Sequence, residues 1–362
     1  MKLRPFTVVL IVPTGIGATI GGYAGDALPV ARAIAECCER LITHPNVLNG
    51  AQMYWLLPNT LYVEGYALDK FAAGSWGLRA VHQNRIGLIL DCALEEELRL
   101  RHLQAAEAAR ATLGLNLTDY VLTDAPLGVE LRRAPTGASW GTLANPDSLL
   151  RAAEVLINRA KAEALAVVAR FPDNLDSEEL QQYRRGQGVD PLAGAEAVIS
   201  HLIVREFHIP CAHAPALKPL PLDPHLSPRA AAEELGYTFL PCVLVGLSQA
   251  PQYITTKSEF CQPSDVWAAQ VDAVVIPATA CGGSAVLSLS QLKNVQIIAV
   301  SENETTMQVP PEKLGIKAVR VNSYLEALGV LVARRAGVST VALSPSISCL
   351  HRLQVNQFAS TP

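Results

Sequence analysis

Short runs of valine, isoleucine and leucine, separated by stretches of helix-forming residues, are the feature that most constrains the fold of this chain. The apolar runs cover residues 7–12, 85–91, 164–171, 239–246, 272–277, 295–300 and 317–321. Most of them lack polar–apolar alternation, which is typical of strands covered by helices on both faces. Helical composition alternates with them, at residues 27–41, 93–113, 148–163, 193–207 and 324–336. This order predicts an α/β protein with parallel, doubly wound sheets and covering helices.

The length of the chain, 362 residues, favours two domains over one. A polar segment at residues 170–190 and a proline-rich segment at residues 210–228 are the candidate boundaries, because neither is typical of a regular core element. We therefore expect two lobes: an N-terminal α/β lobe over residues 1–190, which carries a glycine-rich loop, and a C-terminal α/β lobe over residues 191–362.

Charge, aromatic content and cysteine spacing narrow the range of partners. The net charge is -4 and aromatic residues make up 6% of the chain, so no nucleic-acid partner is expected. No apolar stretch reaches the roughly 18 residues of a membrane helix, and the run before Pro13 is interpreted as the first strand rather than a signal peptide. The eight cysteines form no CxxC pair, which is typical of a reducing compartment. These features predict a cytoplasmic protein without a membrane partner, and they leave a homo-oligomer open.

The segment between the first strand and the first helix, residues 13–27, is called the glycine loop below. Its backbone amides, together with the N-terminus of the following helix, are suited to hold a phosphate or carboxylate. Gly15, Gly17, Gly21 and Gly22 are the candidate anion-binding residues. Their spacing is neither that of a dinucleotide-binding loop nor that of a Walker loop, so no cofactor is identified. The alternative is a tight strand–helix turn with no ligand.

A second candidate, Cys281, follows the apolar run at residues 272–277 and precedes a predicted helix. A thiol at a helix N-terminus has a lowered pKa, which would make Cys281 a nucleophile with a pKa below about 8.5. Gly282 and Gly283 would bring backbone amides close to the reacting group. The alternative is a small cysteine buried beneath the helix.

Polar residues also follow the next apolar run. Glu302 and Asn303 come directly after residues 295–300, at an edge that parallel pairing would place beside Cys281. Glu302 is a candidate acid or base, and Asn303 a candidate for orienting a ligand. The alternative is a polar surface loop.

His201 lies among apolar residues in the predicted helix 193–207, where we expect it to be enclosed. It is a candidate base, and the alternative is a histidine of the core. Glu64 is a further carboxylate of interest, although a solvated helix face explains it equally well. No spacing of histidines, cysteines and carboxylates indicates a metal site.

The combination of the glycine loop with GAEAVISH (194–201), TACGGSAVL (279–287) and ENETT (302–306) resembles a family of unknown function, DUF3326, which is found in cyanobacteria and plants. The resemblance spans nearly the whole chain and implies no established activity. From the residues, we expect a small-molecule enzyme that acts on a phosphorylated or carboxylated metabolite in a cleft between the lobes. The alternative is a non-catalytic metabolite-binding or regulatory protein that uses the same cleft.

Overall fold

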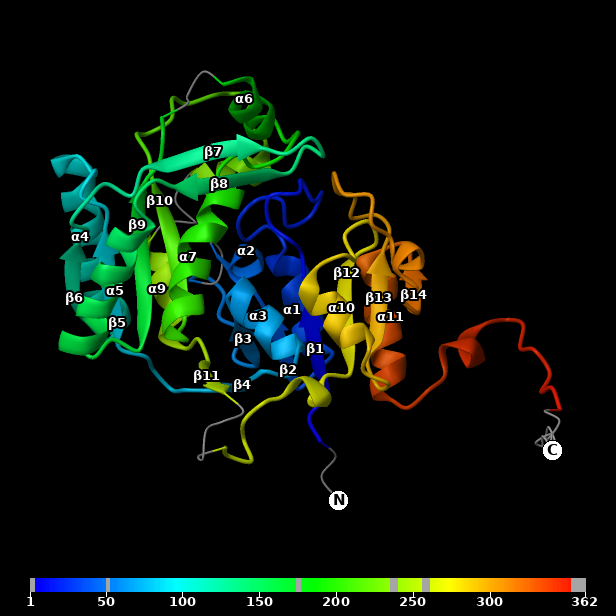
Figure 1. Ribbon diagram of the computed structural model, residues 1–362. Helices are drawn as coiled ribbons and strands as arrows, with labels where there is room; N and C mark the ends of the chain where they lie inside the picture. The colour runs from blue at the N-terminus through cyan, green and yellow to red at the C-terminus, as the bar shows by residue number, and fades with distance from the viewer. Residues whose placement is uncertain (1–3, 50–52, 174–176, 235–239, 256–260, 353–362) are drawn as a thin grey trace, which may run out of the picture.

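Two parallel β-sheets, each covered by helices on both faces, organise the molecule (Figure 1). The computed structural model describes residues 4–49, 53–173, 177–234, 240–255 and 261–352. Neighbouring strands within both sheets run parallel. The predicted α/β class with parallel sheets is therefore confirmed.

The larger sheet has six strands, and its two halves come from opposite ends of the chain. The strand order is β14-β13-β12-β1-β2-β3. Their bounds are β14 Ala318–Val321, β13 Gln296–Val300, β12 Ala273–Pro277, β1 Thr7–Leu10, β2 Arg40–Thr43 and β3 Thr60–Tyr62.

Strand β1 shows why the apolar runs lack alternation. Val8 and Leu10 point into one core and Val9 into the other, so both faces of the strand are buried. On the first face lie α1 (Leu28–Glu36) and α11 (Tyr324–Arg335), and on the second lie α3 (Gly65–Ala72) and α10 (Ser284–Ser290).

The smaller sheet has four strands in the order β10-β9-β5-β6. Its strands are β10 Cys211–Ala216, β9 Ala164–Arg170, β5 Ile86–Leu90 and β6 Leu117–Leu122. Its helices are α4 Glu96–Leu113 and α9 Leu240–Ser248 on one face, and α5 Pro146–Arg159 and α7 Ala193–Phe207 on the other. Both hydrophobic cores contain residues from both sheets, so the two sheets share their cores.

The chain passes from the larger sheet to the smaller one and back through two adjacent strands, β4 (Trp76–Arg79) and β11 (Gln252–Thr255). These strands pair antiparallel, with Arg79 opposite Gln252. A boundary at residue 190 would fall between β9 and β10, which are neighbours in one sheet. The division of the chain into folding units at that residue stays a prediction.

One strand was predicted at residues 239–246, but its described residues, from Leu240 on, belong to the helix α9 (Leu240–Ser248). Its described residues are buried almost throughout, so the apolar run carries no periodicity that would distinguish a helix from a strand. Pro241 lies in the first turn, where a helix tolerates proline and a central strand does not.

The remaining elements lie around the smaller sheet. A hairpin of β7 (Val129–Arg133) and β8 (Ser139–Leu143) extends above the N-terminal residues, with α6 (Glu178–Arg184) nearby (Figure 1). Two short helices are α2 (Pro45–Leu48) and α8 (Pro228–Ala232). Within the described ranges, no helix is both long enough and apolar enough to cross a membrane.

Candidate functional site

The carboxyl edge of the larger sheet contains a switch point between β1 and β12. These strands are neighbours, but the chain continues from β1 toward β2 and from β12 toward β13, in opposite directions. In open α/β sheets, ligands bind in the crevice that such divergent connections leave. The glycine loop follows β1 into this crevice, and residues 278–283, called the β12 loop below, enter it from the other side.

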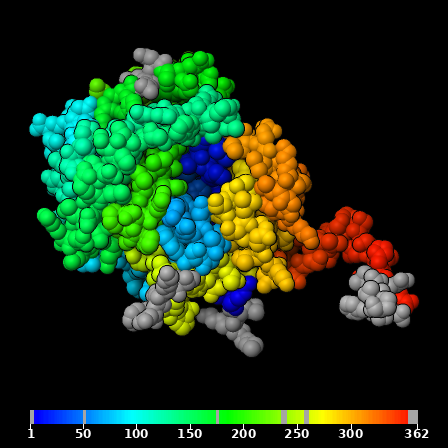
Figure 2. Space-filling model, in the orientation of Figure 1, coloured from blue at the N-terminus to red at the C-terminus, as the bar shows by residue number. Residues whose placement is uncertain are grey.

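A hollow in the surface lies over this edge. Figure 2 shows dark-blue N-terminal residues at its bottom, with α3 and α7 on one side, α10 on the other and the β7–β8 hairpin above. Elements of both sheets therefore form its rim.

The glycine loop depends on its glycines for conformation and for close packing. Gly15, Gly17 and Gly21 have φ of 70°, 61° and 89°, in the left-handed region that favours glycine. A Cβ at Gly15 would lie 2.7 Å from Ser139 Oγ, and one at Gly17 would lie 2.9 Å from Val189 Cγ2. The loop therefore packs against the hairpin and the chain before α7. A Cβ at Gly22 would meet the Ala18 carbonyl oxygen at 2.2 Å.

Asn303 fixes this loop from the end of β13. Its Oδ1 accepts from the Ile20 amide at 2.9 Å, and its Nδ2 donates to the Ile20 carbonyl and to the Tyr324 hydroxyl, each at 2.8 Å. The side chain is fully buried. Backbone bonds continue the contact, from Thr19 N–H to the Glu304 carbonyl and from Thr306 N–H to the Ile16 carbonyl. Asn303 thus positions the loop with two of its three hydrogen bonds, while the third joins it to α11.

A run of amides in the loop remains available. Within the described part of the chain, the N–H groups of residues 14–18, which include Gly15, Gly17 and Ala18, donate to no acceptor. Gly15 and Ala18 are buried, where an unpaired N–H is costly unless a ligand or water accepts from it. Consecutive free amides of this kind are suited to an anion.

Two further side chains hold the ends of the loop. The buried His44 accepts from the Val12 amide through Nε2 at 3.0 Å, and burial lowers the pKa of His44 to about 4. At the far end, Glu233 accepts from the Ala24 amide at 3.0 Å and from the Tyr183 hydroxyl at 2.7 Å. Burial raises the pKa of Glu233 to about 7.

His201 forms an ion pair with Glu64, which lies at the N-terminus of α3. Nδ1 of His201 lies against Glu64 Oε1, and Glu64 is itself held by the amides of Tyr66 and Ala67. The Glu64 side chain is buried, whereas the His201 side chain is 43% exposed. The expectation that His201 is enclosed was therefore wrong, because α3 covers the ring only in part.

The electrostatics of the pair favour a charged imidazole. Burial opposes the charge on His201, but the hydrogen bond and the negative charge of Glu64 outweigh this effect and raise the pKa of His201. The negative charge of Asp69, one turn further along α3, also raises the pKa of His201. Asp69 in turn accepts from the Ala285 amide of α10. These contacts join α7, α3 and α10 at the rim of the hollow.

Cys281 does not have the predicted environment. Its side chain is fully buried, and Sγ faces the carbonyls of Pro277 and Ala278 at 3.8 Å. Burial raises the pKa of Cys281 to about 11, opposite in direction to the lowered value predicted. The error arose because α10 begins at Ser284, while the Cys281 amide bonds back to the Val309 carbonyl. Gly282 and Gly283 are exposed at the surface above the thiol.

Glu302 contacts the helix that follows β14. Its Oε1 accepts from the Tyr324 amide at 2.8 Å, at the start of α11. This contact is a helix cap in its geometry. The roles of Cys281, Glu302 and His201 in catalysis stay predictions.

The structure brings together only some of the predicted residues. The four glycines of the glycine loop and Asn303 form one unit, while His201 joins Glu64. The pairing of Glu64 with His201 was missed, since 137 positions separate them in the chain. A usable signal existed: Glu64 directly follows a strand and precedes a helix, as Glu302 follows β13.

Comparison with known proteins confirms the resemblance noted in the sequence. The family model described as "Protein of unknown function (DUF3326)" matches residues 7–344. An uncharacterized lipoprotein of Synechococcus sp. is 60% identical over 342 residues, which cover 94% of each chain. Among solved structures, a periplasmic ribose ABC transporter from Conexibacter woesei matches 52% of this chain and 74% of its own, at 13% identity and a TM-score of 0.18. That score is too low to bear on fold or function.

The relative corrects one prediction and settles the family. Because it is named a lipoprotein, the cytoplasmic location predicted from cysteine usage is contradicted. The scattered cysteines argue only against a framework of disulfides, and a protein outside the cytoplasm can lack disulfides as well. The family model covers most of the chain, and the relative is similar over nearly its full length. The chain therefore belongs to the DUF3326 family, whose description is that of a protein of unknown function.

Proposed function

We propose that the protein is an enzyme that acts on a small phosphorylated or carboxylated metabolite in the hollow between the two sheets. The observation that carries the proposal is the pair of Glu64 and His201. A buried carboxylate holds one nitrogen of a half-exposed imidazole, which is how proteins orient a histidine for proton transfer.

The carboxylate sets the proton state of the ring. With Glu64 at Nδ1, the second nitrogen, Nε2, is the one that could exchange a proton with a ligand. Because the pKa of His201 is raised, the ring holds a proton near neutral pH more often than a free histidine does. His201 is therefore suited to act as a general acid, with Glu64 as its positioning residue.

The anion would lie against the glycine loop. The free amides of Gly15, Gly17 and Ala18 offer three donors without a formal charge, and the divergent strands β1 and β12 flank them. Phosphate and carboxylate are the ligand groups that match such donors.

A turnover screen tests the proposal. Wild-type protein and His201→Gln are incubated with a library of phosphorylated and carboxylated metabolites, and consumption is followed by mass spectrometry. We expect a substrate whose turnover falls at least about a hundredfold in His201→Gln. The control is His82→Gln, since His82 is an exposed histidine outside the site and should leave turnover unchanged.

Titration of His201 by NMR gives a second readout. Glu64→Gln removes the negative charge but keeps an acceptor, so the pKa of His201 should fall while the protein stays folded. Equal turnover in wild-type protein and His201→Gln would contradict the proposal.

The alternative is a non-catalytic metabolite-binding protein. The burial of Cys281 and the contact of Glu302 with α11 favour it, because they leave fewer reactive groups at the hollow. In that case the screen would find ligands that stabilise the protein and are not consumed.

A further inference from the structure

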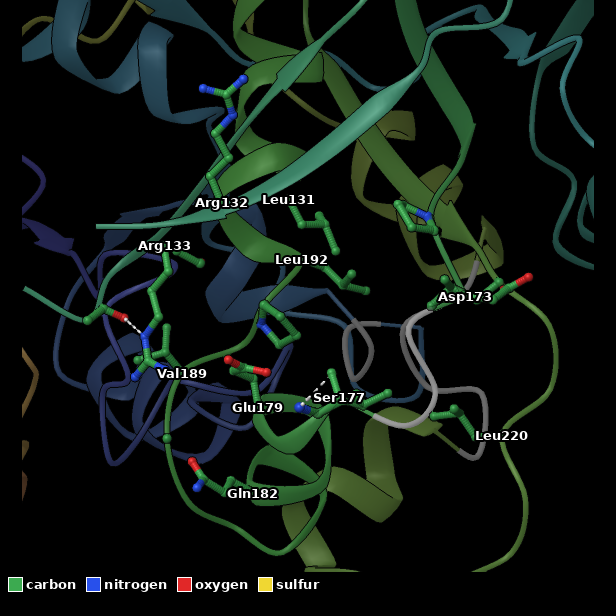
Figure 3. Close-up of a pocket in the computed structure, with 17 residues that line it drawn as sticks. Leu131, Arg132, Arg133, Asp173, Ser177, Glu179, Gln182, Val189, Leu192 and Leu220 are labelled. Carbon is green, nitrogen blue, oxygen red and sulfur yellow. Dashed lines mark hydrogen bonds between the residues drawn. The ribbon is translucent and has the colours of Figure 1, made fainter. Parts of the chain in front are cut away.

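A cavity of about 250 Å³ lies on the far side of the wall that packs against the glycine loop (Figure 3). It is partly open to solvent and is lined by the β7–β8 hairpin, by α6, by the segment that leads into α7 and by the segments that follow β9 and β10. Neither His201 nor Glu64 lines it. Six of its seventeen lining residues have aliphatic side chains, namely Leu131, Leu180, Val189, Leu192, Leu217 and Leu220.

Two of the four charged residues that line this cavity already have ion partners. Arg132 pairs with Glu130 and lies over the Trp140 ring, and Figure 3 shows its side chain directed away from the other labelled residues. Asp173 pairs with Arg170 and with Lys218. Their charges are therefore compensated within the protein.

The other two, Arg133 and Glu179, have opposite charges, are exposed to solvent and have no ion partner among the described residues. Arg133 uses Nε to donate to the Gly137 carbonyl at 3.3 Å, and no described carboxylate pairs with its guanidinium. Glu179 likewise pairs with no cation in the described part of the chain. Figure 3 shows both side chains reaching toward the region beside Val189.

We propose that this cavity binds an apolar α-amino acid in its zwitterionic form. The carboxylate of the ligand pairs with Arg133 and its ammonium group with Glu179, while its side chain packs against the leucines. A water molecule takes about 30 Å³ in the liquid, so the cavity of about 250 Å³ has the volume of about eight water molecules. That volume is sufficient for an amino acid of the size of leucine or phenylalanine.

The wall between the cavity and the glycine loop is thin. Val189 lines the cavity, and its Cγ2 would lie 2.9 Å from a Cβ built on Gly17. Ser139 lines the cavity, and its amide donates to the Gly15 carbonyl at 2.8 Å. A ligand in the cavity therefore contacts the residues that support the glycine loop, although the two sites hold different chemical groups.

Calorimetric titration of the full chain with L-phenylalanine tests this proposal. We expect saturable binding at one site per chain. Arg133→Gln and Glu179→Gln should each weaken it about tenfold or more, because each removes a charge-assisted contact. Arg132→Gln is the matched control, since it removes a neighbouring guanidinium that is directed away from the cavity, and it should bind as wild type does.

Ligand analogues separate the zwitterion from simpler ligands. Phenyllactate lacks the ammonium group and phenethylamine lacks the carboxylate, so both should bind at least about tenfold more weakly than phenylalanine. Leu192→Trp should abolish binding by filling the cavity. Equal affinity for phenyllactate, or no binding of phenylalanine or leucine by folded wild-type protein, would overturn the proposal. Because the cavity contains neither His201 nor Glu64, these outcomes do not depend on whether the protein turns over a metabolite.

Discussion

The glycine loop and the β12 loop leave neighbouring strands at the same edge of one sheet, yet they differ in almost every other respect. Both carry glycines between a strand and a helix, and both were predicted to present backbone amides to a ligand. The glycine loop is held by Asn303, His44 and Glu233, and the amides of residues 14–18 stay free among the described residues. In the β12 loop the Cys281 thiol is buried and the glycines face solvent. Glycine spacing therefore predicts where a loop lies, whereas distant residues decide what it offers to a ligand.

The largest loss of stability is expected from removal of the Asn303 side chain, which holds the glycine loop. Asn303→Ala leaves the buried amide and carbonyl of Ile20 and the Tyr324 hydroxyl without partners, so we expect a loss of about 4 kcal/mol in the free energy of unfolding. Denaturant unfolding measures this loss. Asn294→Ala, at an exposed position in the same region of the chain, should cost less than about 0.5 kcal/mol. A similarly small loss of unfolding free energy for Asn303→Ala would show that the hydrogen bonds of Asn303 do not stabilise the glycine loop.

Acid should weaken the start of the glycine loop through His44. The unfolded chain binds a proton at a pKa near 6.5, but folded His44 does so only at about 4, so the contribution of neutral His44 is fully present above pH 6.5 and is lost as pH falls to about 4. The size of this shift corresponds to about 3 kcal/mol. Unfolding is measured from pH 7 to pH 4 for wild-type protein and for His44→Gln, which keeps an acceptor but does not titrate. A difference between the two proteins that is constant with pH would contradict this assignment.

Alanine at one glycine of each loop compares their backbones directly. Gly17→Ala places a Cβ at a φ of 61° and 2.9 Å from Val189, so we expect a loss of about 2 kcal/mol. Gly283→Ala occurs at a φ of -70° with no atom within 4 Å, so its cost should stay below about 1 kcal/mol. Both losses are read from unfolding midpoints under identical conditions. Equal costs would mean that the two loops have similar packing.

The last prediction concerns the rate at which the thiol of the β12 loop reacts, and it involves no change in stability. Because burial raises the pKa of Cys281 to about 11, iodoacetamide at pH 7.5 should modify it much more slowly than the exposed Cys349. Peptide mapping by mass spectrometry gives the rate at each cysteine. Modification of Cys281 at the rate of Cys349 in folded protein would restore it as a candidate nucleophile.

What the sequence predicted correctly depends on local pattern. The apolar runs that became β1, β5, β9, β12, β13 and β14 were identified because strands with two buried faces are apolar throughout. Helix 193–207 was predicted with its observed bounds. The strand predicted at residues 239–246 failed because a short helix buried on all sides has the same composition.

The properties of the candidate site depend on contacts between distant parts of the chain. Cys281 is buried partly because its amide pairs with the Val309 carbonyl, 28 residues later. His201 has a raised pKa because of Glu64, which belongs to the other sheet. Neither contact has a signature in residue spacing, so residue type alone placed these groups near a site without giving their chemical state.

The antiparallel pair of β4 and β11 makes the smaller sheet an inserted unit whose two ends meet. Since Arg79 lies opposite Gln252, a short turn could join them and close the larger sheet without the intervening residues. The same pair is the place where both covalent connections cross from one sheet to the other. A rotation of one sheet against the other would therefore have to bend both strands and also separate side chains of the shared cores.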